Sequence, residues 1–318
     1  MVRLLMQSAR KICGVGVLIL LCGGCGVVSL LLGTTTHQRS GWKAEDFFTE
    51  PKVIALCHAI EANDLAEMDR LVRAGADVNA QGKHKMTPLL WAFPDNHLPR
   101  FKWLLEHGAN PNVVIEDEIK AYRPIHRGDS VTHMACRTWF PGYFEAVFDN
   151  GGDANIRRSG PLGDSDRPLH TVIQAPVSER RAKVQRLIEL GADMNALALG
   201  TTPVGMAVGW GGQFDLALVM LRAGANFRTY NEDEIWRLTH MVVRQEGRLK
   251  EYSPEKQAQF HELVKWLEEQ GESYAEAKKD MDRWDSWSRT TGVFNEKMDA
   301  EIAERKAREQ AAAEPQPK

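Results

Sequence analysis

The phrase Gly-Ala-Asp-Val-Asn at residues 75–79 decides the fold, because versions of it return along the chain. The steps between the first glycines of successive versions are 33, 43, 40 and 33 residues, a spacing typical of repeat proteins. The later versions are GANPN from Gly108, GGDAN from Gly151, GADMN from Gly191 and GANF from Gly224. The two long steps predict extra residues that are inserted at one place in an otherwise regular unit.

Residues at fixed distances before each glycine predict a helix. In the first unit Met68, Leu71 and Val72 stand seven, four and three positions before Gly75, and mainly apolar residues keep these positions in the later units. That spacing places them on one face of an α-helix. The glycine suits the left-handed residue that ends such a helix. We therefore expect each unit to bury the same helix face and to end that helix in the same way.

A second phrase stands about 21 residues before each glycine and predicts the start of another helix. It reads TPLLWA from Thr87, SVTHMA from Ser130, RPLHTV from Arg167 and TPVGMA from Thr202. Thr or Ser can cap a helix, and Pro suits its first turn, where no amide hydrogen is required. Together the two phrases resemble those of the ankyrin-repeat family, whose first helix opens with Thr-Pro-Leu-His-x-Ala.

The resemblance implies an all-α solenoid of stacked helix-turn-helix units with short β-hairpin fingers. About six units fit between residues 52 and 272, and the outermost two are degenerate, as end caps are. In the charged tail, Met281, Trp284 and Trp287 are expected to pack on the last unit, with a separate partner site as the alternative. The expected segments are a basic stretch 1–11, an apolar stretch 12–33, a linker 34–51, the repeats 52–272, and a helical tail 273–318 with a disordered end.

The apolar stretch predicts a membrane anchor. Residues 12–33 contain no charge over 22 positions, which is enough for a helix to span a bilayer. Arg3, Arg10 and Lys11 precede it, so the positive-inside tendency places the N-terminus in the cytoplasm. In a bacterial cell this gives a single-pass inner-membrane protein with periplasmic repeats. A lipoprotein signal that ends at Cys25 and a cleaved signal peptide are the alternatives.

Composition and motifs argue against several other functions. The net charge of −3 gives no basic footprint for nucleic acid. Motifs for a catalytic serine, a zinc protease, a phosphate loop or a dinucleotide are lacking, so we expect no cofactor, metal or small-molecule substrate. His133 and His170 occupy the ankyrin helix-start position, where the resemblance implies a structural role. Cys57 and Cys136 lie two repeats apart and are expected to be unpaired core thiols.

The inserted fingers and the ends of the first helices are the candidate surface for a protein partner. The fingers are Val113–Asp129 and Ile156–Asp166, and Tyr and Arg, which they contain, are enriched at protein interfaces. The resemblance implies that the ends of the first helices face the concave side. Solvated fingers without a role and a tucked Trp210 are the alternatives. The candidate partner-binding residues are Glu116, Tyr122, Arg123, Arg127, Arg137, Arg157, Arg158, Gln174 and Trp210.

These observations predict a non-enzymatic protein-interaction module that is tethered to the membrane. Its most specific form is an immunity or inhibitor protein that binds a secreted toxin or effector in the periplasm. That form follows from the resemblance and the expected setting rather than from any residue. A scaffold or assembly factor for an envelope enzyme or complex is the alternative. An enzyme with an unrecognised site in the tail is a third hypothesis, against which the mainly solvated Glu and Lys residues of the tail argue.

Overall fold

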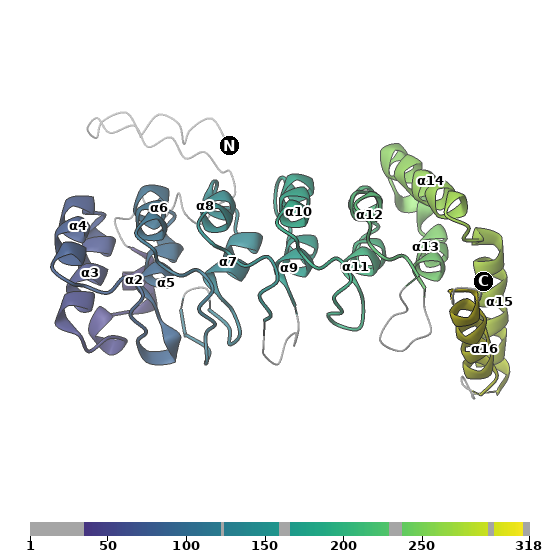
Figure 1. Ribbon diagram of the computed structural model, residues 1–318, viewed down its shortest axis with the longest axis horizontal. Coiled ribbons are helices and arrows are strands. Elements are labelled where there is room, and N and C mark those ends of the chain that lie inside the picture. The colour runs from purple at the N-terminus through teal and green to yellow at the C-terminus, as the bar shows by residue number, and fades with distance from the viewer. Residues whose placement is uncertain (1–34, 122–123, 159–165, 229–236, 292–295, 314–318) are drawn as a thin grey trace, which may run out of the picture.

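The structure is a computed structural model, and it describes residues 35–121, 124–158, 166–228, 237–291 and 296–313. In this part of the chain six antiparallel helix pairs stand side by side along the long axis, with the fingers projecting from one side (Figure 1). The first helices are α3 (Pro51–Ala62), α5 (Pro88–Ala92), α7 (Val131–Arg137), α9 (Pro168–Gln174), α11 (Pro203–Gly209) and α13 (Leu238–Glu246). The second helices are α4 (Leu65–Arg73), α6 (Leu98–Glu106), α8 (Tyr143–Asp149), α10 (Arg180–Glu189), α12 (Phe214–Arg222) and α14 (Pro254–Glu269). The expected all-α repeat architecture is confirmed.

The four predicted starts of first helices are confirmed, and three of them have the expected hydroxyl cap. The hydroxyl groups of Thr87, Ser130 and Thr202 accept hydrogen bonds of 3.1 to 3.3 Å from the amide three residues later. Arg167 at the fourth start makes no such bond, and Pro168 at the first helical position begins that helix instead.

The predicted helix ends are confirmed as well. Gly75, Gly108, Gly151, Gly191 and Gly224 all have φ between 78° and 98°, in the left-handed region. Glycine has no Cβ and adopts this conformation without a steric penalty. This explains why glycine begins every copy of the phrase.

The rest of the phrase links neighbouring units. In Asn112, Nδ2 donates to the carbonyl oxygen of Gly151 at 2.8 Å, while Oδ1 accepts from the amide of Asp153 at 2.9 Å. Asn79 and Asn155 make the same two bonds to the units that follow them. The asparagine is therefore a connection from one unit to the next, repeated along the stack.

The expectation that the fingers form β-hairpins is wrong. Within the described residues the fingers form no strand and instead close through two isolated bridges, Ile119 with Ile125 and Ala198 with Thr201. In the longer finger the backbone bonds of Ile115 with Asp129 and of Ile119 with Ile125 are four residues apart, whereas a β-ladder needs continuous pairing.

The predicted membrane-spanning stretch 12–33 lies outside the described residues. No helix in the described ranges is both long and apolar enough to cross a membrane. The expected linker carries α2 (Thr36–Ser40) and η1 (Ala44–Asp46). The Trp42 ring stacks on the Trp91 ring of α5 with centroids 5.7 Å apart, so this segment packs against the second unit.

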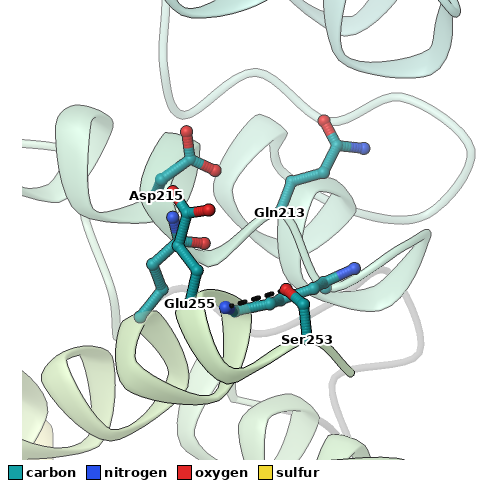
Figure 2. Close-up of a pocket in the computed structure, with 7 residues that line it drawn as sticks. Gln213, Asp215, Ser253 and Glu255 are labelled. Atoms are coloured by element: carbon teal, nitrogen blue, oxygen red, sulfur yellow. Dashed lines mark hydrogen bonds between the residues drawn. The ribbon is translucent and has the colours of Figure 1, made fainter. Parts of the chain in front are cut away.

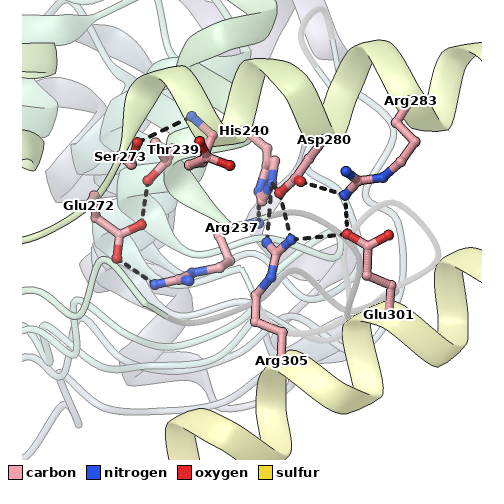
Figure 3. Close-up of polar contacts among 10 residues, drawn as sticks. Arg237, Thr239, His240, Glu272, Ser273, Asp280, Arg283, Glu301 and Arg305 are labelled. Carbon is pink, nitrogen blue, oxygen red and sulfur yellow. Dashed lines mark hydrogen bonds and ion pairs between the residues drawn. The ribbon is translucent and has the colours of Figure 1, made fainter.

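The tail forms α15 (Tyr274–Thr291) and α16 (Glu296–Ala313) beside α13 (Figure 1). The ring of Trp284 lies 4.9 Å from that of His240, which confirms its expected packing on the last unit. Oδ2 of Asp280 in α15 lies 3.3 Å from Nε2 of His240 and 2.5 Å from Nη2 of Arg305 in α16 (Figure 3). The tail helices therefore cover the end of the solenoid through a small apolar contact and a network of ion pairs.

Candidate protein-binding surface

The inserted Val113–Asp129 finger is anchored to the core of the solenoid by three isoleucines. Ile115, Ile119 and Ile125 are each no more than 3% exposed. The amide of Ile115 donates to the Asp129 carbonyl at 2.8 Å, and Ile119 and Ile125 exchange bonds of 2.9 and 3.2 Å. Burying three large apolar side chains fixes the path of the finger, so its polar side chains are held outward.

The N-terminal segment and the preceding finger support it from outside. The indole Nε1 of Trp42 donates to the Lys120 carbonyl at 2.8 Å. Three carboxylates, each between 59 and 68% exposed, also face basic side chains. Exposed ion pairs of this kind contribute little stability, so the carboxylates stay accessible to a partner. The pairs are Glu116 with Lys85 at 3.4 Å, Asp117 with His84 at 3.2 Å, and Glu118 with His126 at 3.6 Å.

Asp129, fully buried at the base of this finger, holds two of the predicted arginines. Arg137 donates to its carboxylate through both terminal nitrogens at 2.8 and 2.5 Å, and Nε of Arg158 lies 3.1 Å away. Burial alone would raise the pKa of Asp129, but the bonds and charge of Arg137, together with Arg158, lower it below its ordinary value. The structure thus brings these two residues together, where they connect the third unit to the Ile156–Asp166 finger.

Gln174 takes the place of Arg137 in the next unit. Its Nε2 donates to both carboxylate oxygens of Asp166 at 3.3 and 3.4 Å, across the same eight-residue separation as Arg137 and Asp129. An amide supplies no full charge, and burial raises the pKa of Asp166 against the influence of Arg158.

The structure describes only some of the other predicted finger residues. Arg127 and Arg157 are exposed. Tyr122, Arg123 and the middle of the Ile156–Asp166 finger, residues 159–165, lie outside the described residues. Those positions remain predictions.

Trp210 is exposed, and a second tryptophan shares its setting. Trp210 caps the end of α11 and is 54% exposed, while Trp139 follows the end of α7 and is 61% exposed. Trp139 is not among the predicted residues, because Arg137 represents that helix end. The available signal was the large indole ring of Trp139, two residues after Arg137.

The finger of residues 192–201 adds an apolar tip that sequence reasoning also missed. Leu197 and Leu199 are 41 and 48% exposed. Leu199 has φ of 50° and Gly200 has φ of 76°, so a bulky side chain occupies a left-handed position in a tight turn. Such strain in an exposed residue is a reason to consider a functional contact.

A polar hollow lies where α12 and α14 begin (Figure 2). Its polar groups already serve the fold, because Oγ of Ser253 accepts from the Lys256 amide at 3.3 Å and the Lys256 ammonium donates to the Gly211 carbonyl. Among the described residues no group of three metal-ligating side chains was found. The hollow is lined by Gly212, Gln213, Asp215, Ser253, Glu255, Lys256 and Gln259.

The histidines and cysteines expected to be structural are buried in the stack. Nε2 of His170 donates to the Ala196 carbonyl of the next finger at 3.1 Å, and burial lowers the pKa of both His133 and His170 to about 4. Cys57 and Cys136 are free and buried, which confirms the prediction of core thiols, and burial raises the pKa of Cys136 to about 12.

Comparison with known proteins gives the same architecture. The ankyrin repeat family model matches residues 84–115. An ankyrin repeat protein of Rickettsia bellii is 25% identical over 197 residues, which span 54% of this chain and 80% of the relative. The crystal structure of the ankyrin repeat domain of Bcl-3, a member of the IκB protein family, resembles the fold with a TM-score of 0.50 and 23% identity, over 69% of this chain and 86% of that one.

The stacked helix pairs, the linking asparagines and the projecting fingers define a helical repeat solenoid of the kind that binds other proteins. The family-model match, the relative and the shared fold together support an ankyrin-repeat family protein. Its repeats indicate a protein-protein interaction module.

Proposed function

We propose that this chain holds a protein partner against its fingers while residues 12–33 tether it to the inner membrane, with the repeats on the periplasmic side. In its most specific form it is an immunity protein that inhibits a secreted toxin or effector. An exported, anchored binding domain is suited to that task, because it meets the toxin before the toxin reaches its target.

The folded Val113–Asp129 finger is the observation that carries the proposal. Three buried isoleucines and a hydrogen bond from Trp42 hold this finger in a defined conformation, unlike a freely solvated loop. This finger presents Glu116, Glu118 and Arg127 to solvent from a fixed base. A preorganised surface binds more tightly, since less freedom is lost on association.

The 192–201 finger supplies the apolar part of the same surface. The 192–201 finger, which carries the exposed Leu197 and Leu199, leaves the stack on the same side as the Val113–Asp129 finger (Figure 1). A partner with a charged region and an apolar region about two units apart fits this arrangement, at roughly 10 Å for each packed helix layer.

The test is affinity capture from a native envelope extract with the full chain in mild detergent. A charge-reversal variant (Glu116→Lys, Glu118→Lys, Arg127→Glu) should retain a specific partner at least about tenfold less well than the unmodified chain. The matched control (Glu106→Lys, Glu145→Lys, Lys102→Glu) makes the same net charge change on α6 and α8. Equal retention by both variants would contradict the proposal.

The captured protein distinguishes the two forms of the function. A single secreted toxin or effector whose activity is lost in the complex supports the immunity form. A resident envelope enzyme or complex that is present without any toxin supports a scaffold or assembly factor instead.

A further inference from the structure

The turns that join the first and second helices line up along one edge of the solenoid, the turn edge. Neighbouring turns lie close together, since the rings of Phe93 and Phe140 are 6.0 Å apart and Arg180, which directly follows its turn, donates from Nη1 to Oε1 of Gln213 at 3.2 Å. Each first helix separates its turn from its finger by its own length, roughly 10 Å for seven residues. The turn edge consists of residues 63–64, 93–97, 138–142, 175–179, 210–213 and 247–253.

Large apolar side chains are exposed at or next to this edge in three units. Trp139 and Trp210 lie in the turns of the third and fifth units and are 61 and 54% exposed. Leu65, which directly follows the first turn, is 37% exposed. An indole combines an apolar body with a polar N–H group, a chemistry that is enriched where membranes meet water.

The chain also reaches the solenoid at this edge. The amide of Thr36 donates to Oδ1 of Asp95 at 2.7 Å, and its hydroxyl lies 3.4 Å from the Pro94 carbonyl. The apolar stretch 12–33 ends three residues earlier in the sequence. Three chain steps span at most about 11 Å.

We propose that the turn edge rests on the lipid surface, with Trp139 and Trp210 in the headgroup region. This rests on the proposed tether, because a stretch that leaves the bilayer three chain steps before Thr36 keeps the turn edge, which Thr36 contacts at Asp95, near the headgroups. The attraction is apolar rather than electrostatic.

Two ion pairs near the edge neutralise their own charges, which favours an apolar contact there. The guanidinium of Arg181 lies 4.0 Å from Asp215, and that of Arg248 lies 3.7 Å from Glu251. Neutral phosphatidylcholine vesicles are therefore a sufficient probe.

The test uses the full chain reconstituted into phosphatidylcholine vesicles that contain lipids brominated near the headgroup end of the acyl chains, which quench nearby tryptophan fluorescence. In the variant Trp139→Ala/Trp210→Ala the amount of tryptophan fluorescence lost to the brominated lipids should fall by at least about half, because the variant lacks the rings placed at the interface. The control Leu197→Ala/Leu199→Ala changes the fingers and should leave the quenching as it is. Unchanged thermal unfolding of both variants, followed by circular dichroism, excludes a general loss of structure.

The outcomes separate this inference from the tether. A chain that floats with the vesicles but shows equal quenching with and without the two tryptophans overturns the lipid contact and leaves the tether standing. A chain that stays in solution when the vesicles float overturns both. Loss of protein capture by the tryptophan variant, with quenching unchanged, overturns the lipid contact in favour of a protein contact.

Discussion

The side-chain amide of Asn112 donates a hydrogen bond of 2.8 Å to the carbonyl oxygen of Gly151, which lies 39 residues further along the chain. The two residues belong to different units, so the contact exists because these units are stacked. The recurring asparagine therefore holds the solenoid together at the place where the fingers leave it.

Replacing this asparagine should weaken the stack. Asn112→Ala removes the bond to Gly151 and the bond from Asp153, so we expect the free energy of unfolding to fall by about 2 kcal/mol. Urea denaturation followed by circular dichroism measures it. Asn150→Ala is the control, because Nδ2 of Asn150 bonds Ala146 in its own helix, and an equal loss in both variants would contradict the inter-unit role.

Two equivalent aspartates should respond differently to neutralisation. Asp129→Asn leaves Arg137 and Arg158 without their carboxylate, so it should cost roughly 2–4 kcal/mol of stability. Asp166→Asn should cost less, since Asp166 is bonded by the neutral Gln174 and burial already raises its pKa. The two variants are compared by urea midpoint at pH 7. The opposite order would show that the ion pairs at Asp129 are not what stabilises the finger base.

Acid should destabilise the repeats through two buried histidines. Burial lowers the pKa of His133 and His170 to about 4, whereas an unfolded histidine titrates at 6.5. Below pH 6.5 the unfolded state binds more protons than the folded state, so stability is full above that value and is lost as the pH falls towards 4. At pH 5 each residue should account for roughly 2 kcal/mol of the loss.

The pH dependence is measured by denaturant unfolding between pH 7.5 and pH 4. The variant His133→Gln/His170→Gln should show a shallower decline than the unmodified chain. His107→Gln is the control, because His107 is exposed, and it should follow the unmodified curve. A double variant with an unchanged slope would refute the assignment.

The tail should detach when its central carboxylate is neutralised. Burial would raise the pKa of Asp280, but His240 and Arg305 lower it to about 2, so Asp280 is ionised at neutral pH (Figure 3). Asp280→Asn should therefore speed amide hydrogen exchange in α16 by loosening its contact with α13. Asp282→Asn, at an exposed position of the same helix, is the control. Equal exchange in the two variants would mean that apolar packing alone holds the tail.

Local signals made much of the fold predictable. Gly75 and its equivalents were readable because a left-handed backbone selects glycine, and Thr87 and Thr202 because a helix start selects a capping hydroxyl. These preferences depend on neighbours in sequence, so they survive without knowledge of the three-dimensional path.

The candidate surface was less predictable, because its contacts join residues that are distant in sequence. Asp129 forms ion pairs with Arg137 and Arg158, and the pair with Arg158 depends on how two fingers approach each other. The stacking of Trp42 on Trp91 depends on the N-terminal segment folding back over the second unit. The β-hairpins were wrong because the family pattern does not specify how many backbone pairs each finger closes.

Amide hydrogen exchange of the chain with and without its captured partner tests the central claim most directly. The account predicts slower exchange on binding in residues 113–121, 124–129 and 196–201, with little change in the second helices α6, α8 and α10. Protection confined to those second helices, with the fingers exchanging as in the free chain, would contradict it.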